Sequence, residues 1–298
     1  VIPCYNRAQG VQAAVASALA NAEFVGEILV VDDGSTDDTP QVLARMERET
    51  TVLRVIRQPN RGVSAARNSG CRAAQFEWIA LLDSDDTWLP GKLEAHWRAL
   101  ERTPFARLSA SRYWGGTPDN PRIKPKVGGD LSRMETHLLQ HFISPSASLM
   151  AASLYLEMGG FDESLLNAGD TDFFLRALLE SPLAIVWEPT ARLFKNKEGL
   201  SNTNRLRSAI NQRAAVERII SLTTGTPHTI DPRHERSILA RWSARVARAQ
   251  LKSGNPAAAL EELRARASLF RGSALDRWRS WRIARQARTA LRKGENRG

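Results

Sequence analysis

The sequence contains little cysteine and no long apolar segment. Cys4 and Cys71 are its two cysteines among 298 residues, too few for a disulfide framework and without metal-ligand spacing. We therefore expect two small buried thiols. No stretch approaches the roughly 18 consecutive apolar residues of a membrane-spanning helix. The chain opens inside its first expected strand, at "VIPCYN", so we expect the natural protein to have residues before Val1.

Negative charge is scarce in the last part of the chain. From Arg233 onward there are 17 Lys and Arg against 5 Asp and Glu, whereas residues 1–232 hold 25 and 27. The net charge of +10 therefore comes from the C-terminal region. A nearly neutral body joined to a basic tail suggests a catalytic module with an electrostatic attachment segment.

Short apolar runs alternate with helical patterns through the first 110 residues. The apolar runs lie at 27–31, 53–56 and 78–82, and the helical patterns at 10–22, 36–48 and 63–75. Strands that alternate with helices form βαβ units, whose parallel strands are buried on both faces. The sequence therefore predicts an α/β fold with a mostly parallel central sheet flanked by helices.

The rest of the chain divides at about residue 203. Further expected elements are helices at about 90–102 and 170–180 and strands at about 106–113, 146–153 and 183–187. Residues 115–130 are rich in Gly and Pro and are expected to form a loop or linker. The tail contains helical patterns at 204–222, 234–252, 257–270 and 275–293. We therefore predict a catalytic domain over 1–203 and a basic all-helical extension over 204–298.

Three carboxylates, those of Asp83, Asp85 and Asp86, directly follow the apolar run 78–82. Ligands of open α/β sheets bind at the carboxyl ends of the strands, and residues two apart in an extended segment point to the same side. Asp83 and Asp85 can therefore converge on a cation. Mg²⁺ or Mn²⁺ held by one or two carboxylates plus substrate phosphates is the typical arrangement. The alternative is a solvated acidic turn that caps the helix from Pro90.

A second acidic pair, Asp32 and Asp33, follows the apolar run 27–31 in "VVDDGSTDDT". Acids near a helix start are favoured by the helix dipole, which explains the later acids of this motif. Asp32 and Asp33 precede the capping position, so capping does not explain them.

A glycine-bearing loop enters a helix in "NRGVSAARNSG" (60–70). Ser64 is a candidate N-cap, and Arg67 falls in the first turn. A guanidinium and backbone N–H groups can jointly face a phosphate there. The alternative is an ordinary surface arginine.

Taken together, the motifs resemble those of family 2 glycosyltransferases, which have the GT-A fold. The motifs occur in the order and spacing of that family and cover about residues 1–200: "VIPCYNR", "VVDDGSTDDT", "NRGVSAARNSG", "LLDSDDTWLPGKL" and "GGFDESLLNAGDTDFFLR". The resemblance implies an inverting transfer of a sugar from a nucleotide diphosphate, with UDP expected, to a hydroxyl of a saccharide or lipid-linked acceptor. It also implies a role in bacterial surface polysaccharide or glycolipid synthesis.

The resemblance carries roles onto individual residues. On the donor side it implies a base pocket of Pro3, Tyr5 and Asp33, a phosphate or base contact from Arg67, and a metal pair of Asp83 and Asp85 for Mg²⁺ or Mn²⁺. On the acceptor side it implies Trp88 as part of the wall. Asp86 is expected to support the metal pair without binding the metal.

The last motif is expected to supply the catalytic base. Asp170 matches that position of the family, while Gly169 stands where many members have Glu, a change that can alter acceptor contacts. Asp172 and Arg176 lie four residues apart, and we expect them to form a structural pair along the helix.

The tail helix 276–293 carries six arginines beside Trp278 and Trp281. In sequence, Trp278, Trp281, Ala284, Ala287 and Leu291 suggest one apolar stripe. A basic amphipathic helix with Trp fits an anionic membrane surface. The alternative is a helix that packs its Trp stripe onto the catalytic domain. No nucleic-acid-binding motif is recognisable, so we expect no nucleic acid partner.

Two other functions compete with sugar transfer. A nucleotidyltransferase also uses paired acids and a metal, but "IPCYNRAQG" is not the Gly-rich basic loop expected near its first strand. A non-catalytic protein that binds nucleotide sugars or a membrane surface would not need the base at Asp170. The expected location is the cytoplasm, with peripheral attachment to the inner face of the membrane.

Overall fold

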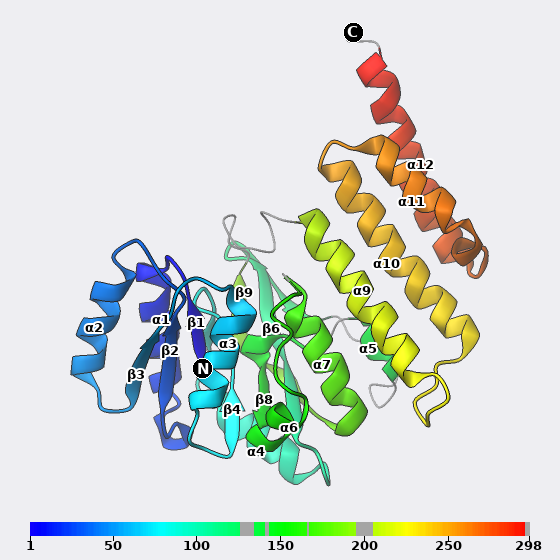
Figure 1. The fold of residues 1–298 in the computed structure, drawn as a ribbon. Coiled ribbons are helices and arrows are strands. Elements are labelled where there is room, and N and C mark those ends of the chain that lie inside the picture. Colours follow the sequence, from blue (N-terminus) through cyan, green and yellow to red (C-terminus); the bar gives the residue numbers. More distant parts are fainter. Residues whose placement is uncertain (126–133, 141–142, 166, 195–204, 296–298) are drawn as a thin grey trace. The chain divides into compact units, whose positions relative to one another are not determined.

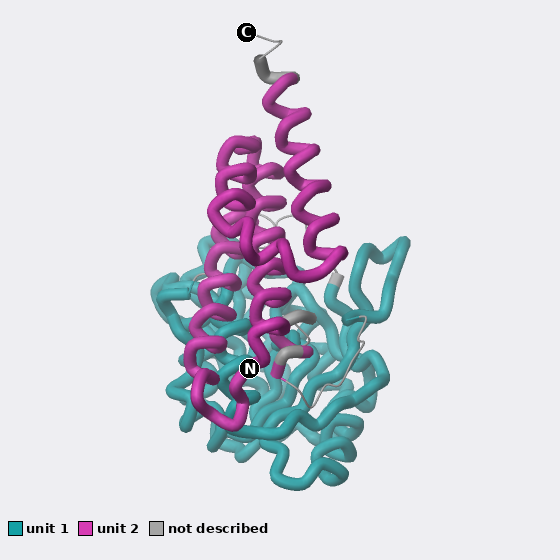
Figure 2. Tube along the Cα trace, turned by 90° about the vertical axis from the view of Figure 1, so that its right-hand side faces the viewer, with its two compact units in different colours: residues 1–132, 140–197 teal, residues 133–139, 198–298 magenta. Residues whose placement is uncertain are grey.

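The structure is a computed structural model that describes residues 1–125, 134–140, 143–165, 167–194 and 205–295 (Figure 1). The chain divides into two compact units (Figure 2). Unit 1 comprises Val1–Ser132 and Gln140–Lys197, and unit 2 comprises Arg133–Leu139 and Glu198–Gly298. A short segment from the middle of the chain therefore groups with the C-terminal helices, which the sequence did not indicate.

Unit 1 begins with a parallel sheet of three strands in the order β1, β2, β3. The strands are β1 (Ile2–Cys4), β2 (Ile28–Asp32) and β3 (Leu53–Arg57), and the helices that follow them are α1 (Ala8–Leu19), α2 (Thr39–Glu49) and α3 (Val63–Ala73). All five residues of β2 are buried, as expected for a parallel strand covered on both faces. The predicted alternation of strands and helices is confirmed here.

The second sheet of unit 1 is mixed and has the strand order β4, β8, β6, β9, β5, with β7 beside β6. Its strands are β4 (Trp78–Ala80), β5 (Thr87–Trp88), β6 (Leu108–Thr117), β7 (Asn120–Lys124), β8 (Ser148–Ala151) and β9 (Leu183–Phe194). Within the described part of this sheet, β6 and β9 run parallel and the other pairs are antiparallel. The prediction of a mostly parallel sheet therefore holds for β1–β3 but not for these strands.

The segment 115–130 is not a loop throughout, which corrects the sequence-based expectation. Strand β6 continues to Thr117 and β7 begins at Asn120, so a tight hairpin joins them. A two-residue connection cannot make the crossover that parallel strands need. Residues 126–130 lie outside the described residues.

Backbone hydrogen bonds join the two sheets. The amino group of Val1 donates to Ala80 O (2.8 Å), and the N–H of Leu82 donates to Val1 O (3.0 Å). The segment 80–82 therefore runs alongside β1, which itself pairs with β2. As a result, the residues that follow β1, β2 and β4 meet at one edge, where the acidic motifs lie.

Aromatic packing holds α7 (Gly169–Glu180) in place. The rings of Phe161 and Phe173 stack with 4.3 Å between their centroids, and Tyr155 of α6 (Ala152–Glu157) lies 6.1 Å from Phe173. These buried rings belong to the same core as Leu108 of β6. Burial of such large apolar side chains is the main stabilising term of a core, and here it positions the helix that carries Asp170.

Both cysteines are buried and free. Burial raises the pKa of Cys4 and of Cys71 to about 12. A thiol with so high a pKa is inert at neutral pH, so the prediction of two structural thiols is confirmed.

Unit 2 is helical in its described residues. Its helices are α9 (Arg205–Thr223), α10 (Pro232–Lys252), α11 (Pro256–Ala265) and α12 (Ala274–Glu295), together with most of α5 (Met134–Gln140). Helices were predicted close to these bounds in the tail, except that α11 ends five residues early, before a 3-10 turn at Ala267–Arg271. In the described chain, no helix combines the length and apolarity that crossing a membrane requires.

Helix α12 does not have the apolar stripe that the sequence suggested. Its buried side chains include Ile283 and Ala287, which pack with Ala244 of α10. Trp278 and Trp281 are 48% and 56% exposed instead. At 100° per residue, Trp278 and Ala287 point in opposite directions, so the two tryptophans cannot share a face with Ala287.

Candidate active site

The acidic motif after β4 is held by a serine from a distant segment. The backbone N–H of Asp83 donates to Ser146 Oγ (3.0 Å), and the Ser146 hydroxyl donates to Asp86 Oδ2 (2.6 Å). Ser146 O in turn accepts from the indole N–H of Trp88 (3.0 Å). One residue of the turn Pro145–Ala147 therefore sets both ends of the motif. The sequence analysis missed Ser146, because nothing in "ISPSASLM" signals contact with residues some 60 positions away.

The carboxylates of this motif repel one another. Desolvation and the neighbouring Asp83 carboxylate raise the pKa of Asp85, and the same two causes raise the pKa of the buried Asp86 still further. Arg7 lies near enough to Asp85 to oppose this shift, but it does not cancel it. A shortage of positive charge at a group of carboxylates is the electrostatic signature of a cation site.

Arg67 of α3 is a buried cation beside the motif. Its Nη2 donates to Asp83 Oδ1 (2.6 Å), and its guanidinium lies 5.7 Å from the centroid of the Phe161 ring. Burial by itself lowers the pKa of Arg67, but the carboxylates of Asp83 and Asp170 outweigh it and hold that pKa above its usual value. The structure therefore brings Arg67, Asp83 and Asp170 together from α3, the segment after β4 and α7.

The Nε–H of Arg67 is buried and has no hydrogen-bond partner among the described residues. Leaving a buried charged donor unsatisfied is costly. A guanidinium with a free N–H beside a carboxylate motif is a suitable contact for a phosphate group. The sequence-based alternative for Arg67, an ordinary surface arginine, is wrong, because the residue is 5% exposed.

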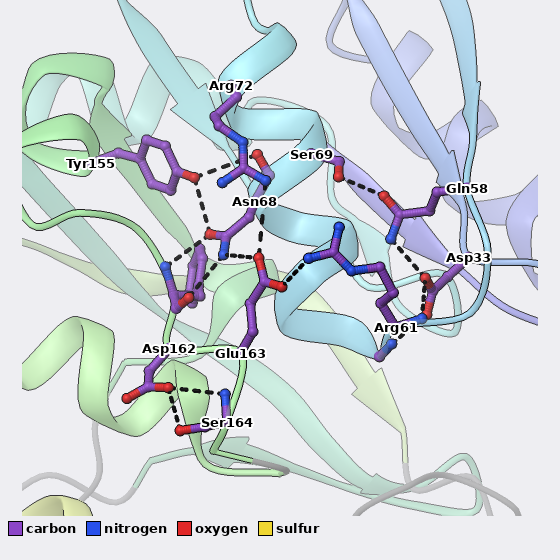
Figure 3. Close-up of polar contacts among 12 residues, drawn as sticks. Asp33, Gln58, Arg61, Asn68, Ser69, Arg72, Tyr155, Asp162, Glu163 and Ser164 are labelled. Carbon is purple, nitrogen blue, oxygen red and sulfur yellow. Dashed lines mark hydrogen bonds and ion pairs between the residues drawn. The ribbon is translucent and has the colours of Figure 1, made fainter.

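Asp33 fixes the loop that precedes α3. Its Oδ1 accepts from Gln58 Nε2 (2.7 Å) and from the N–H of Arg61 (3.0 Å), while Oδ2 accepts from the N–H of Gly62 (2.7 Å) (Figure 3). Gly62 takes φ +89°, a conformation that favours glycine, and occupies the N-cap position of α3. The prediction that Ser64 is the N-cap is therefore wrong.

Asp32 lies on the other side of the same strand end. Its Oδ1 accepts from the N–H of Ser35 (2.9 Å), and its Oδ2 lies 3.5 Å from Arg57 Nε. Asp32 is 1% exposed and shapes the turn after β2. This is a local structural role, whereas Asp33 reaches across to the next loop.

A second set of contacts ties α3 to the segment that leads into α7. The Asn68 side chain donates to Phe161 O (2.8 Å) and to Glu163 Oε1 (3.0 Å), and its Oδ1 accepts from the N–H of Phe161 (2.8 Å). Glu163 also forms an ion pair with Arg61 (2.6 Å). Figure 3 shows the Asp33 loop and the 161–164 segment joined through Arg61 and Glu163.

Asp170 lies in the first turn of α7 and is half-buried. Its Oδ1 accepts from the N–H of Thr171 (2.8 Å), which leaves Oδ2 with no hydrogen bond among the described residues. Gly169 packs against α3 so closely that a Cβ there would lie 2.3 Å from Ser64 Oγ. A side chain at position 169 would therefore crowd α3, which explains the glycine there. The predicted structural pair is confirmed, since Arg176 Nε donates to Asp172 Oδ2 (2.8 Å).

Three further predicted site residues differ in exposure. Pro3 is buried in β1 opposite Val31, whereas Tyr5 follows the strand and is 46% exposed. Trp88 is only 7% exposed and packs in the core of β1 and β2. Its indole N–H supports Ser146, and its expected place in the acceptor-side wall stays a prediction.

A buried polar network that the sequence analysis missed lies in the same unit. Lys92 of α4 (Lys92–Glu101) is fully buried, with Nζ 3.0 Å from His96 Nε2, and His96 Nδ1 lies 2.8 Å from Ser109 Oγ. Burial lowers the pKa of Lys92 to about 7, and burial followed by the Lys92 charge lowers the pKa of His96. The Lys92 ammonium also lies 5.2 Å from the centroid of the Trp88 ring.

Replacing Lys92 by methionine is expected to raise the free energy of unfolding at pH 7 by about 1–4 kcal/mol, because a buried cation without a carboxylate partner is removed. The unfolded lysine has a pKa of about 10.4. Between pH 7 and 10 the unfolded wild type therefore binds more protons than the native state, so its stability rises with pH in that window. Urea unfolding at several pH values checks this. Lys92→Met should lose the rise and Lys124→Met should keep it; an unchanged slope in Lys92→Met would contradict the burial argument.

With a metal at Asp83 and Asp85, as the family resemblance implies, replacing Ser146 by alanine is expected to raise the metal concentration for half-maximal donor turnover about 10–100-fold, the usual effect of losing a residue that orients metal ligands. It should also lower the free energy of unfolding by about 1–3 kcal/mol, since Asp86 loses a buried donor. Metal titrations of activity check this beside Ser253→Ala, a hydroxyl deletion in unit 2. A merely structural role would lower stability and leave the metal dependence unchanged.

Comparison with known proteins gives three findings. The family model described as glycosyl transferase family 2 matches residues 1–158. The succinoglycan biosynthesis protein ExoU of Rhizobium meliloti (strain 1021) is 43% identical over 195 residues, which cover 60% of this chain and 56% of ExoU. The chain spans less than a third of several other curated relatives.

Two solved structures are similar in fold. S. aureus TarS 1–349 in complex with UDP-GlcNAc superposes with a TM-score of 0.63 at 18% identity, over 98% of this chain and 90% of that one. The mannosyltransferase PcManGT from Pyrobaculum calidifontis, in complex with GDP-Man and Mn²⁺, gives 0.60 at 19% identity, over 98% and 85%. At these identities the likeness shows the GT-A fold that the sequence predicted.

Proposed function

The chain belongs to glycosyl transferase family 2, and we propose that it transfers a hexose from a UDP-sugar to a hydroxyl of a saccharide or lipid-linked acceptor, with inversion at the anomeric carbon. The observation that carries the proposal is the convergence of Arg67, Asp83 and Asp170 from three segments. Such a reaction needs a site for a diphosphate and a base for the attacking hydroxyl. The acidic motif with Arg67 suits the first, and Asp170 suits the second.

The nucleotide is proposed to lie against the residues that follow β1 and β2. The exposed ring of Tyr5 offers a face for the base, and Pro3, buried in β1, is proposed to back this pocket. Asp33 Oδ2 accepts one hydrogen bond in the described chain, which leaves capacity for a ring N–H of uracil. The similar TarS structure holds UDP-GlcNAc and PcManGT holds GDP-Man, so nucleotide sugars of both kinds belong in the test.

The residues present fit a divalent metal. Asp83 and Asp85 offer carboxylate oxygens, the ligands that Mg²⁺ and Mn²⁺ prefer, and the raised pKa of Asp85 marks a local excess of negative charge. No group of three or more His, Cys, Asp and Glu side chains in the described chain could hold a metal by itself. We propose that Asp85 and Asp83 hold Mg²⁺ or Mn²⁺ together with donor phosphates, where the ion would stabilise charge on the departing diphosphate.

Asp170 is proposed to be the base of a single displacement. Its Oδ2 accepts the proton of the acceptor hydroxyl while that oxygen forms a bond to the anomeric carbon. The bond from this carbon to the diphosphate oxygen breaks, and the pair of electrons leaves with the diphosphate. Arg67, with its free Nε–H and its contact to Asp83, is placed to hold the phosphate side during transfer.

The last part of the proposal concerns the acceptor and the surface at which the enzyme meets it. ExoU is named for succinoglycan biosynthesis, which supports a polysaccharide or its lipid-linked precursor as the acceptor here. The basic helix α12 would bring the enzyme to an anionic membrane surface. Such attachment would suit an acceptor that is anchored in lipid.

The proposal is tested by release of nucleoside diphosphate from UDP-, GDP- and dTDP-sugars, with Mn²⁺ or Mg²⁺ and again with EDTA. We expect metal-dependent release from one donor, lost in Asp85→Ala and in Asp170→Asn. Metal-dependent donor binding without turnover on any donor or acceptor would favour a binding protein instead. No binding of any donor would overturn the proposed function.

A further inference from the structure

Helix α10 carries a line of basic side chains along one edge of its contact with α12. Arg241, Arg245, Arg248 and Lys252 follow one another at spacings of four, three and four residues, which places them on one face of the helix. Arg279 of α12 lies near Arg241 and Arg248, and Arg282 lies near Arg248. We call the six residues Arg241, Arg245, Arg248, Lys252, Arg279 and Arg282 the basic strip.

Close helix packing brings these charges together. Ala240, Ala244 and Ala247 of α10 are buried with Ile283 and Ala287 of α12. Small side chains at a helix contact allow the two backbones to approach closely. The flanking arginines of both helices are therefore crowded along the edge of the contact.

Almost no acidic side chain offsets the positive charge of the basic strip. Desolvation and the charges of Arg279 and Arg248 lower the pKa of Arg241, and desolvation followed by Arg282 and Arg279 lowers the pKa of Arg248. For Arg245 the causes are desolvation, Arg241 and Arg248. Asp276 is the acid that faces the strip, and it pairs with Arg279 (3.2 Å) and accepts from Ser237 and Ser273.

Other arginines of unit 2 are paired with acidic side chains. Arg213 contacts Glu262, and Arg266 lies 2.7 Å from Glu217 and 3.5 Å from Glu262. Within the described residues, no ion pair involves Arg241, Arg245 or Arg248. The contrast indicates that the strip, unlike these arginines, has few acidic neighbours among the described residues. The resulting repulsion lowers the stability of the protein, so the arrangement needs an explanation other than stability.

Exposed apolar side chains border the strip on α12. Leu275, Trp278 and Trp281 are 53%, 48% and 56% exposed. The guanidinium of Arg282 lies 5.2 Å from the Trp278 ring, and that of Arg285 lies 5.5 Å from the Trp281 ring. Tryptophan beside arginine at an exposed face is typical of side chains that lie in the interface of a bilayer.

We propose that the basic strip, together with Leu275, Trp278 and Trp281, is a docking surface for an anionic membrane, in which α10 supplies four of the six basic side chains. Guanidinium groups match phosphate oxygens in geometry and charge. The apolar side chains would enter the interface while the strip contacts headgroups. This surface includes α10, which the sequence did not implicate, and it depends on no step of sugar transfer.

The test measures partition of the full chain onto vesicles of phosphatidylcholine alone and of phosphatidylcholine with phosphatidylglycerol. The variant Arg241→Gln/Arg245→Gln/Arg248→Gln removes three charges from α10 and leaves α12 intact. The matched control, Arg207→Gln/Arg264→Gln/Arg102→Gln, removes three exposed arginines elsewhere. A basic residue near an anionic surface contributes about fivefold, so we expect the strip variant to lose on the order of 100-fold in partition onto anionic vesicles and the control to lose much less.

Three further measurements test the identity of the partner, the stability of the variant and its activity. Soluble diphosphate and single-stranded nucleic acid are added as competitors, and neither should displace the protein from vesicles at physiological salt. Thermal unfolding should show the strip variant to be at least as stable as wild type, because repulsion between like charges is removed. Release of nucleoside diphosphate from the donor, with a soluble acceptor present, should persist in the variant, which separates this proposal from the proposed function.

Three outcomes would overturn the proposal. One is equal partition onto neutral and anionic vesicles. Another is an equal loss in the strip variant and the control, which would mean that net charge alone decides binding. The last is tight binding of nucleic acid that depends on the strip while vesicles are not bound.

Discussion

Replacing Asp170 by asparagine is expected to lower the turnover number for sugar transfer by about 10²–10⁴-fold, the usual contribution of a general base. Asparagine keeps the size of the side chain and its hydrogen bond from the N–H of Thr171, but it cannot take a proton. The donor should therefore still bind with nearly unchanged affinity. Initial rates and donor binding, measured on the same preparation, check both statements.

The control for Asp170 is Asp119→Asn, which removes an exposed carboxylate in the β6–β7 turn. It should behave like wild type. If Asp170→Asn retained turnover within a few-fold of wild type, Asp170 would not be the base. If it lost donor binding as well, its role would lie in assembling the site around Arg67.

Replacing Asp85 by asparagine is expected to raise the Mn²⁺ concentration for half-maximal activity by at least about 100-fold, since even residues that only orient metal ligands contribute 10–100-fold. Asparagine keeps one oxygen but loses the charge that a hard divalent ion requires. Activity titrations with Mn²⁺ and Mg²⁺, each with an EDTA blank, measure the shift. Unchanged metal dependence would exclude Asp85 as a ligand.

Stability gives a second readout for Asp85. Its pKa is raised in the folded chain, so between the unfolded and folded pKa values the native state binds more protons than the unfolded state. Stability without metal therefore falls as the pH rises through this window. Asp85→Asn should reduce that fall, to which Asp86 also contributes, and unfold at a temperature no lower than wild type at pH 7. In the absence of metal, a carboxylate that binds the metal is thus expected to lower the stability of the protein, whereas a structural carboxylate would raise it. Loss of stability in Asp85→Asn would contradict the argument that the carboxylates repel one another.

The outline of unit 1 could be predicted because its signals are local. Apolar runs followed by helical patterns produced β1–β3 and α1–α3 at nearly the expected places. The strand at about 106–113 was predicted, but the end of β6 and the strand β7 were missed, because Gly and Pro, which usually mark loops, lie within these strands. The pairing of β8 between β4 and β6 joins residues far apart in sequence, so no local pattern contains it.

The residues of the candidate site likewise divide into those that a local motif indicates and those that only tertiary contacts reveal. Asp33, Asp83, Asp85 and Asp170 were found because each stands in a short motif at the end of an element. Ser146 and the pair of Lys92 and His96 were missed because their partners come from other strands. The burial of Trp88 was not predicted either, since a sequence shows that an indole follows a motif but not which way its ring points.

The sequence by itself determined the family, the α/β class of the first 200 residues and the acids that mark the site. These properties depend on residue type and spacing, which a linear pattern contains. Only the tertiary structure decided that Arg67 meets Asp83 and that Asp33 is tied to the loop before α3. It also decided that α12 buries Ile283 and exposes Trp278 beside Arg282. Contacts between distant segments are selected by how whole surfaces pack, and a stretch of sequence does not contain the surface against which it will lie.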